Sequence, residues 1–267
     1  MLARRCPALD SPIPIARILP RVLLSSILLY LTLTLCGLGM GVMVIKYDLH
    51  RTEPWWLLLI ALVLGAGLME VAGRVQFAAV KHLFHTSGGE FPSNIVLAFL
   101  AASTEEVAKF TVVCFIALCF RKQFDEPLDG LIYGSFAGLG CALAESVATM
   151  GFGHQSAFLP AQEPERLAGH LIMGGIGGFG LGLLTNRSRF AFFAIPAGLI
   201  VAVLLHWLWD IIAFDAADRF YDVHSLGGQH TLVPIALMIF GMAVFRWLVR
   251  VGAALTRVHL ATHSILT

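Results

Sequence analysis

The chain has 267 residues, of which 58% are hydrophobic and 13% are charged, and its mean hydropathy is +0.81. Soluble domains are about 45–50% apolar and about 25% charged, so this composition excludes an ordinary soluble fold. We predict an all-α, polytopic transmembrane helix bundle with about seven or eight membrane helices and the lipid bilayer as its surroundings. The net charge of +1 gives no support for nucleic-acid binding.

The apolar runs divide the chain into segments that are long enough to cross a bilayer. Residues 1–21 carry four arginines and four prolines, and we expect an irregular basic leader there. The first apolar run, 22–45, is too long for a typical signal-peptide core, so we expect an uncleaved span. A single membrane domain would cover 22–251 and a C-terminal tail 252–267. The later runs are expected at about 55–80, 94–120, 128–150, 167–184, 190–214 and 232–251.

Basic residues indicate the orientation of the spans, because cytoplasmic loops are enriched in lysine and arginine. If the third to seventh runs each cross once, Arg121, Arg187 and Arg250 lie on one side, which we expect to be cytoplasmic. The basic leader should also be cytoplasmic, and this conflicts with seven crossings. The conflict disappears if the second run, which contains Glu70 and Arg74, is a re-entrant hairpin or an interfacial helix. Eight crossings would also remove it.

Three ionisable residues lie in the middle of the third apolar run: Glu105, Glu106 and Lys109. A charge at that depth costs several kcal/mol or more unless it is paired or wetted. Glu105 and Lys109 are four residues apart and share a helix face, so we expect them to form an ion pair. Glu106 points about 100° away and needs a partner of its own. Neighbouring carboxylates in such a place suit general acid or base catalysis.

Other ionisable residues lie inside the later runs: Glu145, His170, His206 and Asp210. Because consecutive spans alternate in direction, these residues and the two glutamates fall in the same half of the membrane, the non-cytoplasmic half in the orientation above. His206 and Asp210 are one turn apart, so the carboxylate can orient the imidazole. Ionisable groups at one level of four helices favour a functional site over separate, self-satisfied polar residues.

Glycines repeat every four residues in two neighbouring runs, at 130, 134 and 138 and at 174, 178 and 182. Such stripes of small residues let membrane helices approach closely. We expect the fourth and fifth runs to pack tightly, which would bring their ionisable residues together.

Around these residues the chain resembles the PrsW family of intramembrane proteases, within the superfamily that includes CAAX prenyl proteases and bacteriocin-processing enzymes. The resemblance covers about residues 90–215, which would be the catalytic core. Its motifs are Glu105-Glu106-Val107-Ala108-Lys109, similar to E-E-x-x-K; Asp125 to Gly134, which looks like acidic-Pro-x-Asp-Gly-x-x-Tyr-Gly; Arg166 with His170, similar to the third motif; and His206-Trp207-Leu208-Trp209-Asp210, which matches H-x-x-x-D.

Three positions depart from the family pattern near Glu145. Cys141 stands where the family has phenylalanine, Ser146 where asparagine is common, and Thr149 where a tyrosine is expected. These changes keep the acid at 145 and alter the packing and the amide chemistry beside it.

The resemblance implies an intramembrane endopeptidase that cuts a membrane-tethered, single-span protein substrate in the plasma membrane of a bacterium. In bacterial relatives that substrate is an anti-sigma factor. Our hypothesis is that Glu105 or Glu106 is the general base, that His206 holds the water or stabilises the oxyanion, and that Asp210 orients His206. The expected catalytic residues are Glu105, Glu106, Glu145, His206 and Asp210, and the expected supporting residues are Lys109, Arg166 and His170.

A metal ion is one alternative at this site, with His170, His206 and Glu145 as possible ligands of zinc or another divalent ion. The chain has no HExxH motif, and we favour a site without a tightly bound metal. Two other functions stay open. Intramembrane acids and histidines also form the proton relays of transporters, although no internal repeat supports a proton-coupled carrier. The chain could also be a non-catalytic membrane binding partner.

Overall fold

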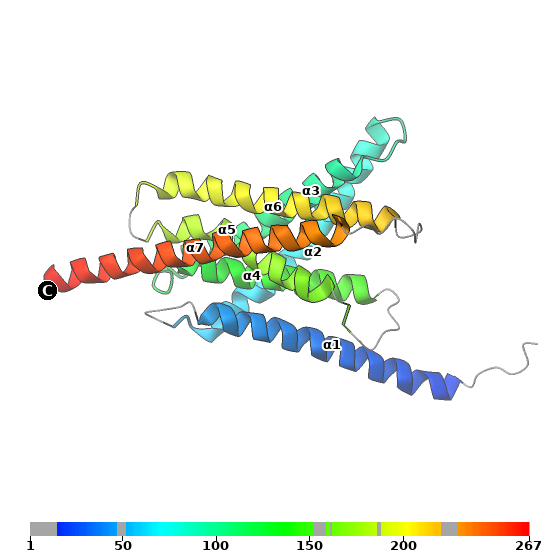
Figure 1. Ribbon diagram of the computed structural model, residues 1–267, viewed down its shortest axis with the longest axis horizontal. Coiled ribbons are helices and arrows are strands. Elements are labelled where there is room, and N and C mark those ends of the chain that lie inside the picture. Colours follow the sequence, from blue (N-terminus) through cyan, green and yellow to red (C-terminus); the bar gives the residue numbers. More distant parts are fainter. Residues whose placement is uncertain are drawn as a thin grey trace, which may run out of the picture.

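The computed structural model describes residues 15–46, 52–151, 159–160, 162–185, 188–219 and 229–266. Within them the chain is all-helical and has no strand, which confirms the predicted fold class (Figure 1). Five of the helices, α1, α2, α4, α6 and α7, are long and apolar enough to cross a membrane. The helices are α1 (Ile15–Ile45), α2 (Trp55–Thr86), α3 (Asn94–Cys119), α4 (Asp129–Gly151), α5 (Gln162–Gly182), α6 (Ala191–Arg219) and α7 (Gln229–Leu266).

The two remaining helices, α3 and α5, each carry three charged residues close together, for reasons that suit their positions. α3 carries three charged residues in its middle, and α5 begins with acidic residues and is rich in glycine. α5 packs against α1, α3, α4, α6 and α7, so other helices rather than lipid surround it. A helix in that position does not need an apolar outer surface, and polar groups can be placed on it at a lower cost.

Glycines set the distance between α4 and α5. A Cβ atom on Gly134 would overlap the carbonyl oxygen of Gly174, and a Cβ on Gly174 would overlap the oxygen of Gly134. Gly130 and Gly178 face each other in the same way, which confirms the close packing that the stripes predicted. A Cβ on Gly138 would overlap the carbonyl oxygen of His170, so this approach places α4 directly beside a site histidine.

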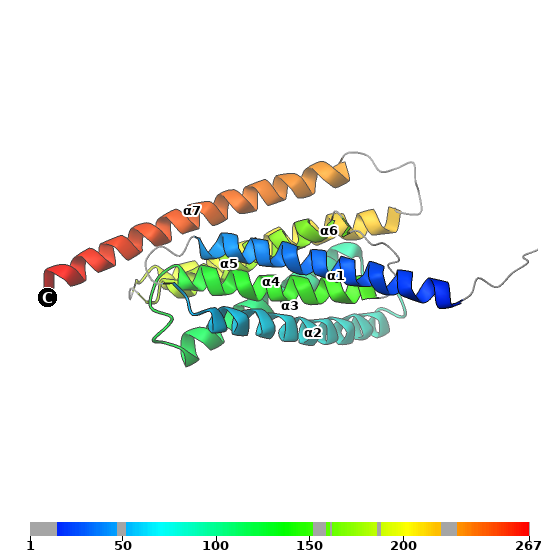
Figure 2. The ribbon, with the colours of Figure 1, turned by 90° about the horizontal axis from the view of Figure 1, so that it is seen from below.

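α2 is one unbroken helix, so the re-entrant hairpin, one of the three arrangements left open for this run, is wrong. It packs against α3 and α4, on the side of the bundle opposite α7 (Figure 2). The Sγ of Cys141 contacts the carbonyl oxygen of Gly65 at 3.2 Å, where the smaller side chain fits between α2 and α4. Glu70 and Arg74 of α2 form an ion pair at 3.2 Å, and their side chains are 71% and 78% exposed.

Successive helices alternate in direction, so the start of α1 and the end of α7 lie at opposite ends of the bundle (Figure 1). The described residues contain no eighth span, and the conflict between the two basic ends of the chain therefore persists. α1 begins at Ile15, inside the expected irregular leader, and residues 1–14 lie outside the described part. α7 continues to Leu266, through the segment that we expected to be a separate tail.

Candidate active site

The ionisable side chains that the sequence analysis selected on α3 and α6 meet around His206, which is 2% exposed. Its Nδ1 lies 2.8 Å from Oε1 of Glu106. Its Nε2 lies 3.6 Å from Oε2 of Glu105 and 3.5 Å from Oδ2 of Asp210. The imidazole is therefore held on one nitrogen by α3, while its other nitrogen faces two further carboxylates.

Lys109 pairs with Glu106 at 2.5 Å, and not with Glu105 as expected. A lysine in a helix can reach a carboxylate three residues before it, here Glu106, as well as one four residues before it, here Glu105. Because the Lys109 side chain is 1% exposed, its charge needs a carboxylate in direct contact. This ammonium keeps Glu106 an acceptor, so Nδ1 of His206 carries the proton between them. Glu106 therefore contacts Nδ1 of His206, while Asp210, which we expected to orient this ring, lies beside Nε2.

A second histidine is held in the same manner from α4. Nε2 of His170 lies 3.3 Å from Oε2 of Glu145, and Nε of Arg166 lies 3.6 Å from the other oxygen of that carboxylate. The rings of His170 and His206 are 4.9 Å apart at an angle of 70°. Nδ1 of His170 is buried and has no hydrogen-bond partner within the described part of the chain.

Glu163 supports Arg166 and was missed by the sequence analysis. Glu163 is 4% exposed, and its carboxylate accepts a hydrogen bond from the hydroxyl of Ser146. The same carboxylate lies 3.4 Å from Nη1 of Arg166, and Nη1 also donates a hydrogen bond to Thr149 at 2.9 Å. Two of the three residues that depart from the family pattern, Ser146 and Thr149, thus take part in the polar contacts around Arg166. The spacing of Glu163 and Arg166, three apart in one helix, was the available signal. Both residues precede the apolar run that the sequence predicts at 167–184.

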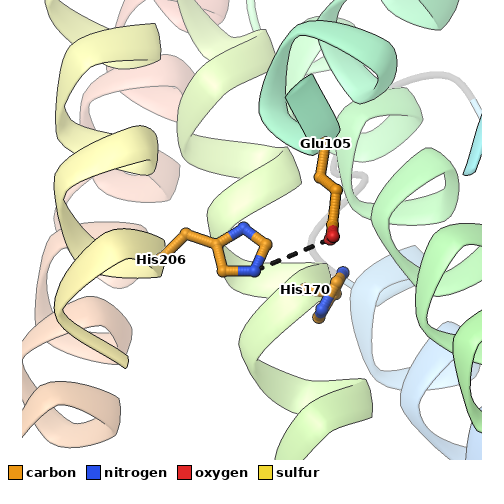
Figure 3. Close-up of side chains that lie close together, drawn as sticks. All are labelled: Glu105, His170 and His206. Atoms are coloured by element: carbon orange, nitrogen blue, oxygen red, sulfur yellow. Dashed lines mark ion pairs between the residues drawn. The ribbon is translucent and has the colours of Figure 1, made fainter. Parts of the chain in front are cut away.

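Glu105, His170 and His206 form the centre of the site (Figure 3). One potential donor atom from each lies within 4.8 Å of the other two, and all three residues are buried. Glu145 contacts Nε2 of His170 and is not one of the three donors. Glu105 is the carboxylate among the possible metal ligands, where we expected Glu145. Two histidines and one carboxylate are a common ligand set of catalytic zinc in hydrolases. The fold and this set of donors together indicate a membrane-embedded enzyme.

Comparison with known proteins identifies the family. The chain belongs to the PrsW family of intramembrane metalloproteases, whose sequence profile matches residues 53–245. Protease PrsW of Bacillus subtilis strain 168 is 28% identical over 193 residues, which cover 69% of this chain and 84% of the relative. Protease PrsW of Oceanobacillus iheyensis is 29% identical over 163 residues, covering 60% and 72%. Protease PrsW of Geobacillus kaustophilus is 26% identical over 180 residues, covering 65% and 76%.

No solved structure matches the chain significantly. The family assignment makes the chain an integral, multi-pass membrane peptidase, in place of the carrier and the non-catalytic partner that the sequence left open.

The family description implies a metal ion, and the residues fit one. Oε2 of Glu105 and Nδ1 of His170 are buried polar atoms without a hydrogen-bond partner in the described part of the chain. The opposite nitrogen of each histidine contacts a carboxylate, Glu145 for His170 and Glu106 for His206. Metal-ligating histidines usually have such a partner, which fixes the tautomer and the ring orientation. The donor set and the family description together favour a metal over the metal-free site that we preferred from sequence.

Proposed function

We propose that this chain is an intramembrane endopeptidase that hydrolyses a membrane-tethered protein, with a divalent ion such as zinc held by Glu105, His170 and His206. The observation that carries the proposal is the convergence of three buried donors whose atoms lie within 4.8 Å of one another. Such an ion would supply a Lewis acid that polarises a carbonyl group and makes water more acidic.

The surrounding residues supply the proton chemistry. Glu106, charged beside Lys109, keeps a proton on Nδ1 of His206 and leaves Nε2 directed into the site. Glu145 acts in the same way on Nε2 of His170. Asp210 lies beside Nε2 of His206 and is not paired with a lysine as Glu106 is. It is therefore our candidate to take a proton from water and return it to the leaving amine.

The substrate that fits this arrangement is a single-span protein. The site lies among helices, so the scissile bond must enter from within the membrane or from its edge. The orientation that puts Arg121, Lys122 and Arg250 in the cytoplasm puts the site in the non-cytoplasmic half. Cleavage near that boundary of a tethered regulator, such as an anti-sigma factor, agrees with both the depth of the site and the resemblance that the sequence shows.

The test is cleavage of single-span tester proteins by the purified full-length chain in lipid vesicles. We expect fragments cut near the non-cytoplasmic boundary, loss of cleavage with a chelator, and recovery with added zinc. Glu105→Gln and His206→Ala should fold and lose roughly 10²–10⁴-fold in rate. Cleavage that survives the chelator but not Glu105→Gln would replace the metal with a carboxylate-only mechanism. Cleavage retained in both variants would refute the site.

A further inference from the structure

Gln76 is a polar residue in the apolar helix α2, which contributes nothing else to the site described above. Its Nε2 donates a hydrogen bond to Oε1 of Glu105 at 3.2 Å and another to Oγ1 of Thr104 at 2.9 Å. The residue is half-buried. A polar amide in an apolar membrane helix is costly unless it is hydrogen-bonded. The two hydrogen bonds of Gln76 satisfy its NH₂ group and connect α2 to α3.

The orientation of the amide follows from its partners. The carboxylate of Glu105 accepts hydrogen bonds only. The hydroxyl of Thr104 directs its own hydrogen to the carbonyl oxygens of Leu100 and Ala101, at 2.8 and 3.0 Å, so it accepts from Gln76. Both partners need a donor, so the NH₂ group, and not the amide oxygen, must point toward α3.

This contact determines which oxygen of Glu105 reaches the histidines. Gln76 occupies Oε1, and Oε2 is left facing Nε2 of His206 at 3.6 Å. Each of the three central residues thus has a different partner on the atom that faces away from the centre of the site. Gln76 is the partner of Glu105, Glu106 that of His206, and Glu145 that of His170. Loss of such an outer partner costs roughly 10–100-fold in metal affinity or activity.

We infer that Gln76 is a positioning residue for the reaction, which fixes the Glu105 carboxylate so that Oε2 points at His170 and His206. The inference rests on the proposed metal-dependent peptidase. It adds α2 to the elements that build the site, and it assigns a role to a residue outside the motifs of the sequence analysis.

The test uses Co²⁺ titrated into the metal-free, full-length chain in detergent, with visible absorption as the readout of ligand geometry. We expect Gln76→Leu to weaken Co²⁺ binding by roughly 10–100-fold and to change the spectrum in the same direction as Glu105→Gln. In the cleavage assay its kcat should fall while KM changes little, because the substitution does not touch the substrate. The matched control is Phe77→Leu, the next residue on α2, which is exposed and should match the wild type in every readout.

Two further variants keep the test decisive. Gln76→Met has a more flexible apolar side chain and should reproduce the effect if Gln76→Leu does not fold. Thr104→Val removes the second anchor and keeps the contact with Glu105, so its loss of affinity should be smaller than that of Gln76→Leu. Wild-type affinity and spectrum in a folded Gln76 variant would overturn the inference while leaving the proposed function intact. Failure of the wild type to bind Co²⁺ would instead refute the metal site, and this inference with it.

Discussion

The interface between α4 and α5 and the interface between α3 and α6 lie in one bundle and are stabilised by different forces. Between α4 and α5, glycine backbones touch, as at Gly134 and Gly174, and the charged contacts of Glu145 with His170 and Arg166 add to that packing. Between α3 and α6, the contacts are polar: Glu106 with His206, and the indole nitrogen of Trp207 with the carbonyl oxygen of Ile95 at 2.9 Å. The first interface sets how near the helices come, and the second sets which side-chain atoms face one another.

Of the substitutions that test this difference between the interfaces, the largest effect on stability is expected at the α3–α6 interface. Glu106→Gln leaves Lys109 buried without a carboxylate and should lower the free energy of unfolding by about 3–5 kcal/mol. The double variant Glu106→Gln with Lys109→Met removes both charges and should regain most of that stability. It should stay nearly inactive, since His206 has lost its carboxylate. Denaturant unfolding in detergent and the cleavage assay measure the two properties separately, and a double variant as unstable as the single one would contradict the pairing.

A smaller effect is expected at the α4–α5 interface. Gly174→Ala adds a Cβ that overlaps the backbone of Gly134 and should cost about 1–3 kcal/mol, since the helices must move apart. Activity should fall with stability, because Glu145 and His170 lie on these two helices. Gly177→Ala on the same helix is the matched control: its Cβ would meet only the Cβ of Ala202 at 3.6 Å, an ordinary contact. Equal destabilisation by the two substitutions would show that backbone contact does not limit this interface.

The smallest effect is expected for Arg166, at the edge of the polar site. Arg166 and Glu145 are 22% and 32% exposed and 3.6 Å apart, so their pairing adds little stability. Glu163, the buried partner of Arg166, keeps its hydrogen bond from Ser146 when Arg166 is replaced. Arg166→Gln should change the free energy of unfolding by less than about 1 kcal/mol and lower the cleavage rate by about tenfold or less. Arg166→Lys keeps the charge and should recover part of the rate. A loss as large as that of Glu105→Gln would place Arg166 at the reacting atoms and not at the edge.

Periodicity and charge predicted the class of fold and the convergence of the site. Apolar runs located the helices, and alternation of spans was enough to bring Glu145, His170 and His206 to one level. Pairing was harder to predict. Lys109 can reach Glu105 or Glu106 along its own helix, and the position of His206 on another helix decides between them.

The contributions of Gln76 and Glu163 could not be derived in that way. Gln76 has no pattern in its own segment that indicates its partner, and the spacing of Glu163 and Arg166 indicates a pair only if both residues lie in one helix. Gln76 acts across a helix pair whose tilt the sequence does not specify, and Glu163 precedes the apolar run that was predicted at 167–184. The predicted helix ends also differ from the observed ones where a helix begins with a polar turn before its apolar run, as α5 does at Gln162.

The attachment of α2 at both ends links the site to the membrane around it. Just before α2, Glu53 accepts a hydrogen bond from Tyr133 of α4, and near the other end Gln76 contacts Glu105. The helical rise puts these two points about 34 Å apart, so a change in tilt of about 5° at the first would displace the second by roughly 3 Å. That exceeds what a hydrogen bond tolerates. Bilayer thickness influences helix tilt, and so the thickness of the host membrane is itself a variable of the active site's geometry.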